Sequence, residues 1–480
     1  MSFLTSLRFK IPLAIRVNKN KWLLVAAIFH VALTISIFFL GQTQILPDLF
    51  DPNGFGKFAS DSREYLGEVE GLAEILRDEG IVVWLHSPSQ QWHNKVIALS
   101  FAVSTPLLGV NILSAELYNL ACYLVILVLV FIVGSEIFNR ETGLMAAAFI
   151  ALLPSFLLHT TQLLKDGLFM SGFLVLILVS VRWLYRKHSP ASALVHALIA
   201  VLVVNMLGMI RLGWPHVYMS MVVFSALGLF VRMKIKREIM LWNLIGSTLV
   251  VGATVVLMVP HFQTLVASYR IPSSPVSESK PLQEGAVGIS EGNSIQDDGS
   301  ALHVPDTSHA AADNLWVSVT FLADSASQIV GVMRQGFVDM YPHSGSTIDA
   351  HYRITNMKSL VYYLPRATQI GFFAPFPNMW IGQGEKLGLS ARLLSGIETL
   401  AMYLVYFLAV LGIWRERRGP SVWYLFIVII LGVVSMGLVV VVIGALYRMR
   451  YVYWMLMFLL GAGGLQGILN ILFGQILVVD

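Results

Sequence analysis

The chain has few charged residues for its length. Of its 480 residues, 12% are Asp, Glu, Lys or Arg, whereas 56% are hydrophobic. Soluble domains contain about 25% charged residues, so this composition cannot cover a water-facing surface. It excludes a soluble enzyme, a fibrous protein and a wholly disordered chain. The net charge of +4 is too small to indicate a nucleic-acid partner.

Cysteine is nearly absent as well. Cys122 is the single cysteine, which excludes an internal disulfide and a cysteine-rich metal site. The sequence also lacks a Walker phosphate loop, a Gly-x-Gly-x-x-Gly motif after a strand and a His-Glu-x-x-His zinc motif. Candidate functional residues must therefore come from scattered charged side chains.

Long apolar runs, by contrast, are abundant. Blocks of about 20 apolar residues are long enough to cross a hydrocarbon core as helices, and they do not alternate as barrel strands do. We therefore predict an all-α polytopic membrane protein with about ten transmembrane helices. The predicted spans are 22–40, 117–134, 142–158, 167–184, 193–210, 214–231, 240–260, 391–414, 421–443 and 450–473.

Basic residues predict how the spans are oriented, because Lys and Arg accumulate in short cytoplasmic loops. With ten spans, every basic cluster falls on one side, and both termini are cytoplasmic. Counting 95–113 or 359–380 as a crossing would reverse the loops that follow. We interpret both as helices or re-entrant pieces at the outer surface, and leave a paired crossing open. The clusters are Arg8, Lys10, Arg16, Lys19 and Lys21; Arg182, Arg186 and Lys187; Arg232, Lys234, Lys236 and Arg237; and Arg415, Arg417 and Arg418.

Two large outer loops follow from this topology. The loop 41–116 is acidic over most of its length, and its apolar residues at helical spacing predict an amphipathic juxtamembrane helix that can lie along the membrane interface; they are Leu66, Val69, Leu72, Ala73 and Leu76. The loop 261–390 contains a stretch, 270–313, without Phe, Trp or Tyr, which is predicted to be flexible. The chain thus divides into a seven-span module 1–260, this second loop, and a C-terminal module 391–480.

Two carboxylates stand out, because ionisable residues gather at the outer ends of the spans instead of their centres. Asp61 can serve as a general base near the membrane surface; alternatively, Asp61-x-x-Glu64 is a capping box. Asp166, in a short outer loop, is the second candidate; alternatively, it is a solvated helix start. His159 is more typical of an interface residue than of a ligand.

Cations on the outer side are the third group: Lys165, Arg211, Arg448 and Arg450. Arginine binds phosphate through two parallel hydrogen bonds, so a lipid phosphate fits these residues. Alternatively, the side chains snorkel to lipid headgroups. Glu398, about two turns into its span, can pair with Arg392 or with one of these arginines.

Taken together, the features resemble the GT-C superfamily of integral-membrane glycosyltransferases, which includes protein mannosyltransferases and lipid A aminoarabinose transferases. The resemblance covers about 1–260 well and 261–480 mainly in layout. It rests on the order of several short motifs: Asp61-x-x-x-Tyr65, Ser114–Asn119, Ile137–Gly143, Leu153-Pro154-Ser155, Leu163-Leu164-Lys165-Asp166 and Tyr447-Arg448-Met449-Arg450-Tyr451.

The resemblance implies inverting sugar transfer from an undecaprenyl- or dolichyl-phosphate carrier to a hydroxyl of a glycan, lipid or protein acceptor. It implies a role in cell-envelope glycan biosynthesis, with the active site on the periplasmic face of a bacterial inner membrane. Asp61 aligns with the catalytic acid of the first loop, and Asp166 with the acidic position of the second. Supporting roles fall to Glu64, Tyr65, His159, Glu398 and Tyr447.

No cofactor is required by the pattern, and dependence on a divalent metal is left open. The first-loop acid of the family is often one of an acidic pair, whereas Ser62 and Arg63 follow Asp61 here. Three alternatives also stay open. They are a polymerase or ligase using a lipid-diphosphate-linked glycan, a lipid-linked sugar flippase or transporter, and a scaffold subunit of an envelope complex.

Overall fold

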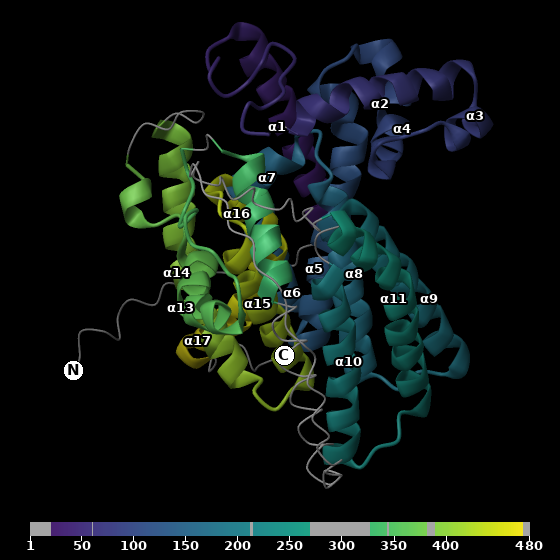
Figure 1. The fold of residues 1–480 in the computed structure, drawn as a ribbon, viewed down its shortest axis with the longest axis vertical. Coiled ribbons are helices and arrows are strands. Elements are labelled where there is room, and N and C mark those ends of the chain that lie inside the picture. The colour runs from purple at the N-terminus through teal and green to yellow at the C-terminus, as the bar shows by residue number, and fades with distance from the viewer. Residues whose placement is uncertain are drawn as a thin grey trace, which may run out of the picture.

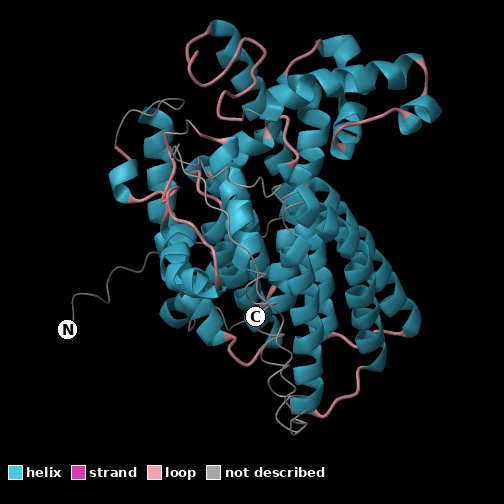
Figure 2. Cartoon of the chain, in the orientation of Figure 1, coloured by secondary structure: helices cyan, strands magenta, loops and turns pink. Residues whose placement is uncertain are grey.

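The computed structural model describes residues 21–59, 61–211, 215–268, 327–342, 345–381 and 389–473. Within these ranges the chain folds into helices joined by loops, and no strand pairs into a sheet (Figure 2). The stretch 270–313, predicted to be flexible, lies outside the described residues. So do most of the N-terminal basic residues.

Eight of the described helices are long and apolar enough to cross a membrane. The prediction of an all-α polytopic membrane protein is therefore confirmed. These helices are α1 (Lys21–Thr43), α5 (Glu116–Ile137), α8 (Asp166–Tyr185), α9 (Pro190–Ile210), α10 (Pro215–Lys236), α14 (Leu389–Arg415), α15 (Pro420–Val439) and α17 (Tyr451–Phe473). The predicted span 240–260 is also helical, as part of α11 (Leu241–Ser268). The count of ten spans stays a prediction.

The predicted span 142–158 is not one continuous helix, because the helix breaks in the middle. It consists of α6 (Arg140–Ala151) and α7 (Pro154–Thr160), which are bent by 70° at the break. Proline has no backbone N–H and disfavours helical geometry in the residue before it. Leu153 is accordingly extended, and Pro154 begins a new helix.

The predicted span 421–443 also ends earlier than expected. Helix α15 ends at Val439, and a separate short helix, α16 (Ile443–Met449), precedes α17. The backbone between α15 and α16 is held by a distant loop: Ile348 N–H donates to Val441 O at 2.9 Å, and Ile443 N–H donates to Ser346 O at 3.1 Å. This pairing competes with helix formation and sets where α16 begins.

The first outer loop folds into a small helical unit across one end of the bundle (Figure 1). It contains α2 (Asp61–Asp78), α3 (Ile81–His86), α4 (Trp92–Leu108) and η1 (Ile112–Ala115). The helices predicted in this loop are therefore present, and their position beside the membrane stays a prediction. The apolar stripe of α2 does not face a membrane, however, because Val69, Leu72 and Ala73 are buried in a core shared with Phe101 of α4.

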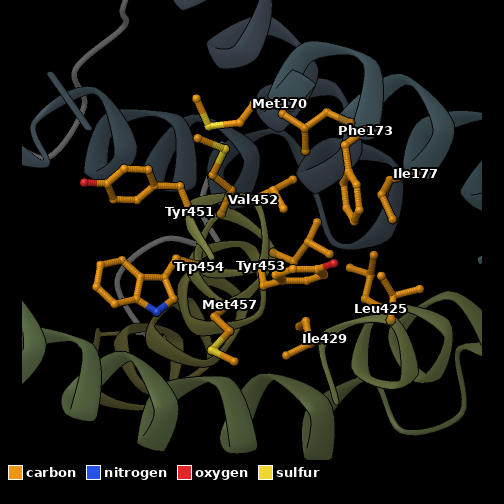
Figure 3. Close-up of a cluster of buried hydrophobic side chains, with 14 of the residues drawn as sticks. Met170, Phe173, Ile177, Leu425, Ile429, Tyr451, Val452, Tyr453, Trp454 and Met457 are labelled. Atoms are coloured by element: carbon orange, nitrogen blue, oxygen red, sulfur yellow. The ribbon is translucent and has the colours of Figure 1, made fainter. Parts of the chain in front are cut away.

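The main core joins spans from both ends of the sequence. Phe173 and Ile177 of α8 meet Leu425 of α15 and Tyr453 and Met457 of α17 (Figure 3). The helix α13 (Met357–Phe373), which covers much of the predicted surface piece 359–380, packs along α15. It is followed by η2 (Pro377–Met379). Packing therefore runs across the predicted boundaries at 260 and 391.

The bundle has a basic end and an opposite end that carries the candidate acids. At the basic end, Glu136 in the last turn of α5 contacts Arg182 at 3.3 Å and Arg186 at 2.8 Å, near the end of α8. The same helices begin at the other end, with Glu116 and Asp166. This arrangement agrees with the predicted topology. Which side of the membrane each end faces stays a prediction.

Candidate functional site

Arg448 stands between the two candidate acids. Its Nη2 lies 2.6 Å from Oδ2 of Asp61, and its Nε lies 3.1 Å from Oδ2 of Asp166. Arg211 completes the group with Nη2 at 2.5 Å from Oδ1 of Asp166. We call these four residues the charge cluster. The sequence analysis selected each of them separately, and the structure brings them together from four different elements.

Helix ends explain why each charge of the cluster is where it is. Asp61 and Asp166 are the first residues of α2 and α8, where the helix dipole favours a carboxylate. Arg211 directly follows α9, and Arg448 is in the last turn of α16, where a cation is favoured. Local sequence therefore places each charge, and the tertiary fold pairs them.

Burial rules out two of the alternatives. Asp166 is 4% exposed, so the interpretation as a solvated helix start is wrong. The side chains of Arg211 and Arg448 are 8% and 17% exposed and contact carboxylates instead of extending to headgroups. Burial acts to lower the pKa of Arg448, but the carboxylates of Asp166 and Asp61 have the larger combined effect and raise that pKa. Arg448 is therefore charged.

Lys165 and Tyr65 lie beside the charge cluster. The Nζ atom of Lys165 is 5.7 Å from the centre of the Tyr65 ring, a cation–π contact. Burial and then the charge of Arg211 lower the pKa of Lys165, while Asp166 and Asp61 act in the opposite direction. Within the described part of the chain, Lys165 forms no ion pair. Its ammonium group therefore has no carboxylate within ion-pair distance among the described residues.

The charge of Asp61 affects the pKa values of two tyrosines. Burial, and after it the carboxylate of Asp61, raises the pKa of Tyr65. The same two causes raise the pKa of Tyr341, which follows the helix over residues 327–340. The sequence analysis missed Tyr341, since no local motif links it to Asp61. Glu64, one turn after Asp61, is exposed and forms no ion pair among the described residues.

Hydrogen bonds attach the loop that carries Lys165 to the loop 41–116 and to α5. Gln162 accepts a hydrogen bond from Gly56 N–H at 2.7 Å through Oε1. The hydroxyl of Tyr118 donates to Leu164 O at 3.2 Å. These bonds fix the backbone immediately before Lys165 and Asp166.

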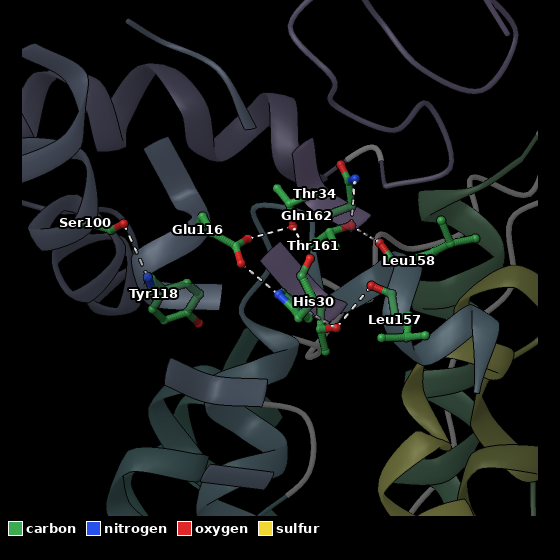
Figure 4. Close-up of polar contacts among 10 residues, drawn as sticks. His30, Thr34, Ser100, Glu116, Tyr118, Leu157, Leu158, Thr161 and Gln162 are labelled. Atoms are coloured by element: carbon green, nitrogen blue, oxygen red, sulfur yellow. Dashed lines mark hydrogen bonds and ion pairs between the residues drawn. The ribbon is translucent and has the colours of Figure 1, made fainter. Parts of the chain in front are cut away.

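A histidine and a glutamate missed by the sequence analysis anchor the same loop from inside the bundle. Nδ1 of His30 lies 2.8 Å from Oε1 of Glu116, and the Thr34 hydroxyl donates to the other oxygen of Glu116 at 2.7 Å (Figure 4). The second ring nitrogen of His30 is 3.3 Å from the Thr160 hydroxyl, at the end of α7. The available signal was a histidine well inside an apolar span, which needs a polar partner.

Glu398 and Tyr447 form a second polar group. Tyr447 precedes Arg448 of the charge cluster in the sequence. The carboxylate of Glu398 accepts from the Tyr447 hydroxyl and from Ser155 N–H, the latter at 2.6 Å. The prediction that Glu398 pairs with Arg392 or another arginine is therefore wrong. The two hydrogen bonds take the place of an ion pair, because α14 faces α7 and α16 at this point.

His159 and Arg450 both pack against aromatic rings. His159 is half-buried and contacts the rings of Phe58 and Tyr451, with the Tyr451 hydroxyl 3.1 Å from its Nδ1. Its interpretation as an interface residue stays a prediction. Arg450 is 1% exposed and packs on Trp454, with its guanidinium 4.4 Å from the ring centre. Its Nη1 donates to Gly371 O at 3.1 Å. The structure thus does not bring Arg450 into the charge cluster.

His93 is a buried residue beside the cluster that the sequence analysis did not single out. It is 1% exposed, meets the Tyr65 ring edge-to-face at 5.2 Å, and has no partner for either ring nitrogen among the described residues. Burial and then the charge of Lys165 lower the pKa of His93 to about 4. The imidazole is therefore neutral near pH 7.

The described residues contain no group of three or more His, Cys, Asp and Glu side chains that could hold a metal ion. Asp61 and Asp166 both contact Arg448, whose guanidinium group lies between the two carboxylates.

Comparison with known proteins adds nothing to these observations. No protein-family model matches the chain, and a search of curated proteins finds no match. The resemblance to GT-C glycosyltransferases therefore rests on the motifs and layout alone.

Proposed function

We propose that this protein is a glycosyltransferase that moves a sugar from a polyprenyl-phosphate carrier to an acceptor hydroxyl at the membrane surface. The observation that supports it best is the charge cluster. Two candidate acids from distant segments share one arginine, at the end of the bundle opposite the basic clusters. The membrane-spanning helices around the cluster suit a donor with a lipid tail.

The balance of charge favours an anionic ligand. Among the charges of this region that are not exposed, Lys165, Arg211 and Arg448 supply three positive charges, against the two negative charges of Asp61 and Asp166. The exposed residues beside them, Arg63 and Glu64, have opposite charges. In addition, Nε of Arg211 is buried and has no hydrogen-bond partner in the described residues. Guanidinium groups bind phosphate oxygens in a forked geometry. A monophosphate ester bound here balances the excess positive charge.

The reaction is a single displacement. Asp61 takes the proton of the acceptor hydroxyl, and the acceptor oxygen forms a bond to the anomeric carbon. The bond from that carbon to the phosphate oxygen breaks, and the electron pair leaves with the lipid phosphate, which inverts the anomeric configuration. Arg448 and Arg211 stabilise the charge that develops on the phosphate, an effect worth roughly 3 kcal/mol for each well-placed donor.

Arg448 couples binding of the donor to the basicity of Asp61. In the structure, the guanidinium contacts the Asp61 carboxylate at 2.6 Å, which occupies the lone pairs that a base needs. A donor phosphate competes for the same guanidinium. Once Arg448 turns toward the phosphate, its ion pair no longer competes with proton transfer to the Asp61 carboxylate.

The test is sugar transfer by the purified protein in lipid nanodiscs, with undecaprenyl-phosphate and undecaprenyl-diphosphate sugars compared as donors. Asp61→Asn should lower the rate about 10²- to 10⁴-fold, the usual contribution of a positioned base. Asp48→Asn, which changes an exposed acid of the same loop, should keep the wild-type rate. A folded Asp61→Asn protein that transfers sugar as fast as the wild type would remove Asp61 from this role. Preference for the diphosphate donor would favour the polymerase or ligase.

A lipid-linked sugar transporter is the second candidate, and two observations favour it. One is the broken span α6–α7, and the other is the His30–Glu116 pair inside the bundle. Transporters place polar residues and helix breaks at their substrate sites. Transbilayer movement of a lipid-linked sugar in proteoliposomes, without any transfer product, would select this function over the first.

A further inference from the structure

Glu398 is a carboxylate inside a membrane-spanning helix. It belongs to α14, is 3% exposed, and has no cation within ion-pair distance among the described residues. An ionisable side chain in such a position is costly and is usually retained for function. The surroundings of Glu398 therefore need an explanation beyond packing.

Each carboxylate oxygen of Glu398 holds a different element. Oε1 accepts the hydrogen bond from Ser155 N–H at 2.6 Å, and Oε2 accepts one from the Tyr447 hydroxyl. Because Pro154 has no N–H, Ser155 carries the first backbone donor of α7. One carboxylate thus joins α7 to α16, two short helices far apart in the sequence.

These two helices lead directly to the charge cluster. Helix α7 ends at Thr160, and residues 161–165 connect it to Asp166. Tyr447 immediately precedes Arg448 in the sequence. A second contact joins α7 to the first residue of α17, since the Tyr451 hydroxyl lies 3.1 Å from Nδ1 of His159. The position of Arg448 relative to Asp166 therefore depends on how α7 and α16 are held.

We propose that Glu398 is a positioning residue that sets the geometry between Arg448 and Asp166 by holding α7 and α16 together. Glu398 does not touch the substrate in this proposal. Its consequence for lipid-phosphate binding rests on the proposed function, whereas the positioning itself does not.

Helix α14 does not need Glu398 in order to stay in the bundle. It packs closely on α17, where a Cβ added at Gly412 would lie under 3.0 Å from Leu460 O, and one at Gly464 equally close to Leu408 O. Loss of the carboxylate should therefore release α7 and α16 without separating α14 from α17. A positioning role therefore predicts a change in α7 and α16 only, whereas a general structural role predicts a change in α14 and α17 as well.

Hydrogen–deuterium exchange in nanodiscs tests the positioning directly. Glu398→Leu removes both acceptors, Tyr447→Phe removes one donor, and Glu398→Gln keeps the shape and an acceptor. Exchange in peptides covering 155–166 and 443–450 should rise about tenfold in Glu398→Leu, less in Tyr447→Phe, and least in Glu398→Gln. Peptides covering 400–412 and 455–466 should be unchanged. The control Glu136→Gln removes a carboxylate at the basic end and should leave 155–166 and 443–450 unchanged.

Unchanged exchange in both regions, or a uniform rise through α14 and α17, would overturn the proposal. Tyr447→Phe keeps the test decisive if Glu398→Leu does not fold. A second measurement uses undecaprenyl phosphate as the probe, with its Kd measured by native mass spectrometry. The Kd should rise about tenfold in Glu398→Leu and less in Glu398→Gln. If the wild-type protein does not bind this lipid, the proposed function fails, while the exchange experiment still decides the role of Glu398.

Discussion

At the residue scale, the pairing of buried charges defines the candidate site. Arg448 bridges Asp61 and Asp166, and Arg211 holds the second oxygen of Asp166. A buried ion pair adds little net stability when it forms, because both partners lose water. Removing one partner is different, since the other charge is left buried and unpaired.

Asp166→Asn should therefore destabilise the protein by about 3–5 kcal/mol, the usual cost of breaking a buried pair. It leaves Arg211, whose side chain is 8% exposed, without its carboxylate. Denaturant unfolding of the purified protein measures the change. Asp78→Asn, at an exposed position of α2, should stay within about 0.5 kcal/mol of the wild type. Equal stability of the two variants would contradict the pairing.

His93 should make stability depend on pH. Its pKa is about 4 in the folded protein and about 6.5 in an unfolded chain. Between these values the unfolded chain binds more protons, so stability is complete above pH 6.5 and falls by about 1.4 kcal/mol per unit as the pH is lowered toward 4.

The check is unfolding free energy at pH 7.5 and 5.0. His93→Asn should lose about 2 kcal/mol less than the wild type across this interval, which covers about 1.5 units of the window. His86→Asn, at an exposed position on α3, should follow the wild type. A wild-type pH dependence that persists in His93→Asn would show that another group is responsible.

At the element scale, helix breaks and close helix contacts shape the molecule. Pro154 splits one predicted span into α6 and α7, and backbone pairing with residues 346–348 separates α15 from α16. Helix α16 carries Arg448 of the charge cluster, and α7 leads through residues 161–165 to Asp166. Glycine lets other helices approach closely, as small residues do at contacts between membrane helices.

Gly464→Ala should destabilise the α14–α17 contact. The added methyl group would lie under 3.0 Å from Leu408 O, a backbone atom that cannot move away alone. Overpacking of this kind costs about 1–3 kcal/mol. Gly252→Ala in α11 is the matched control, because nothing lies within 4 Å of its Cβ position. Thermal unfolding should show a lower Tm for the first variant only; equal Tm values would mean that the helices separate easily here.

At the scale of the whole molecule, charge is sorted between the two ends of the bundle. The ion pairs of Glu136 with Arg182 and Arg186 mark one end, and the charge cluster lies at the other. Lys and Arg favour the cytoplasmic side. The charge cluster should therefore face the outside.

Labelling of single cysteines tests this orientation. In a Cys122→Ala background, Glu74→Cys on α2 should react with a membrane-impermeant maleimide in intact cells, and Arg418→Cys only after lysis. Both positions are exposed. The reverse pattern would place the charge cluster on the cytoplasmic face, and labelling of both in intact cells would show that the membrane was not a barrier in the assay.

Sequence alone was sufficient for the membrane class, for the position of most spans and for the members of the charge cluster. Length and hydropathy of an apolar run are local properties, and so is the preference of acids for helix starts. The tertiary structure decided which charges meet. Glu398 binds Tyr447 instead of an arginine, and Arg450 donates to Gly371 O of α13 instead of joining the charge cluster. Each of these contacts joins residues far apart in the sequence, so it depends on how the helices pack and not on local spacing.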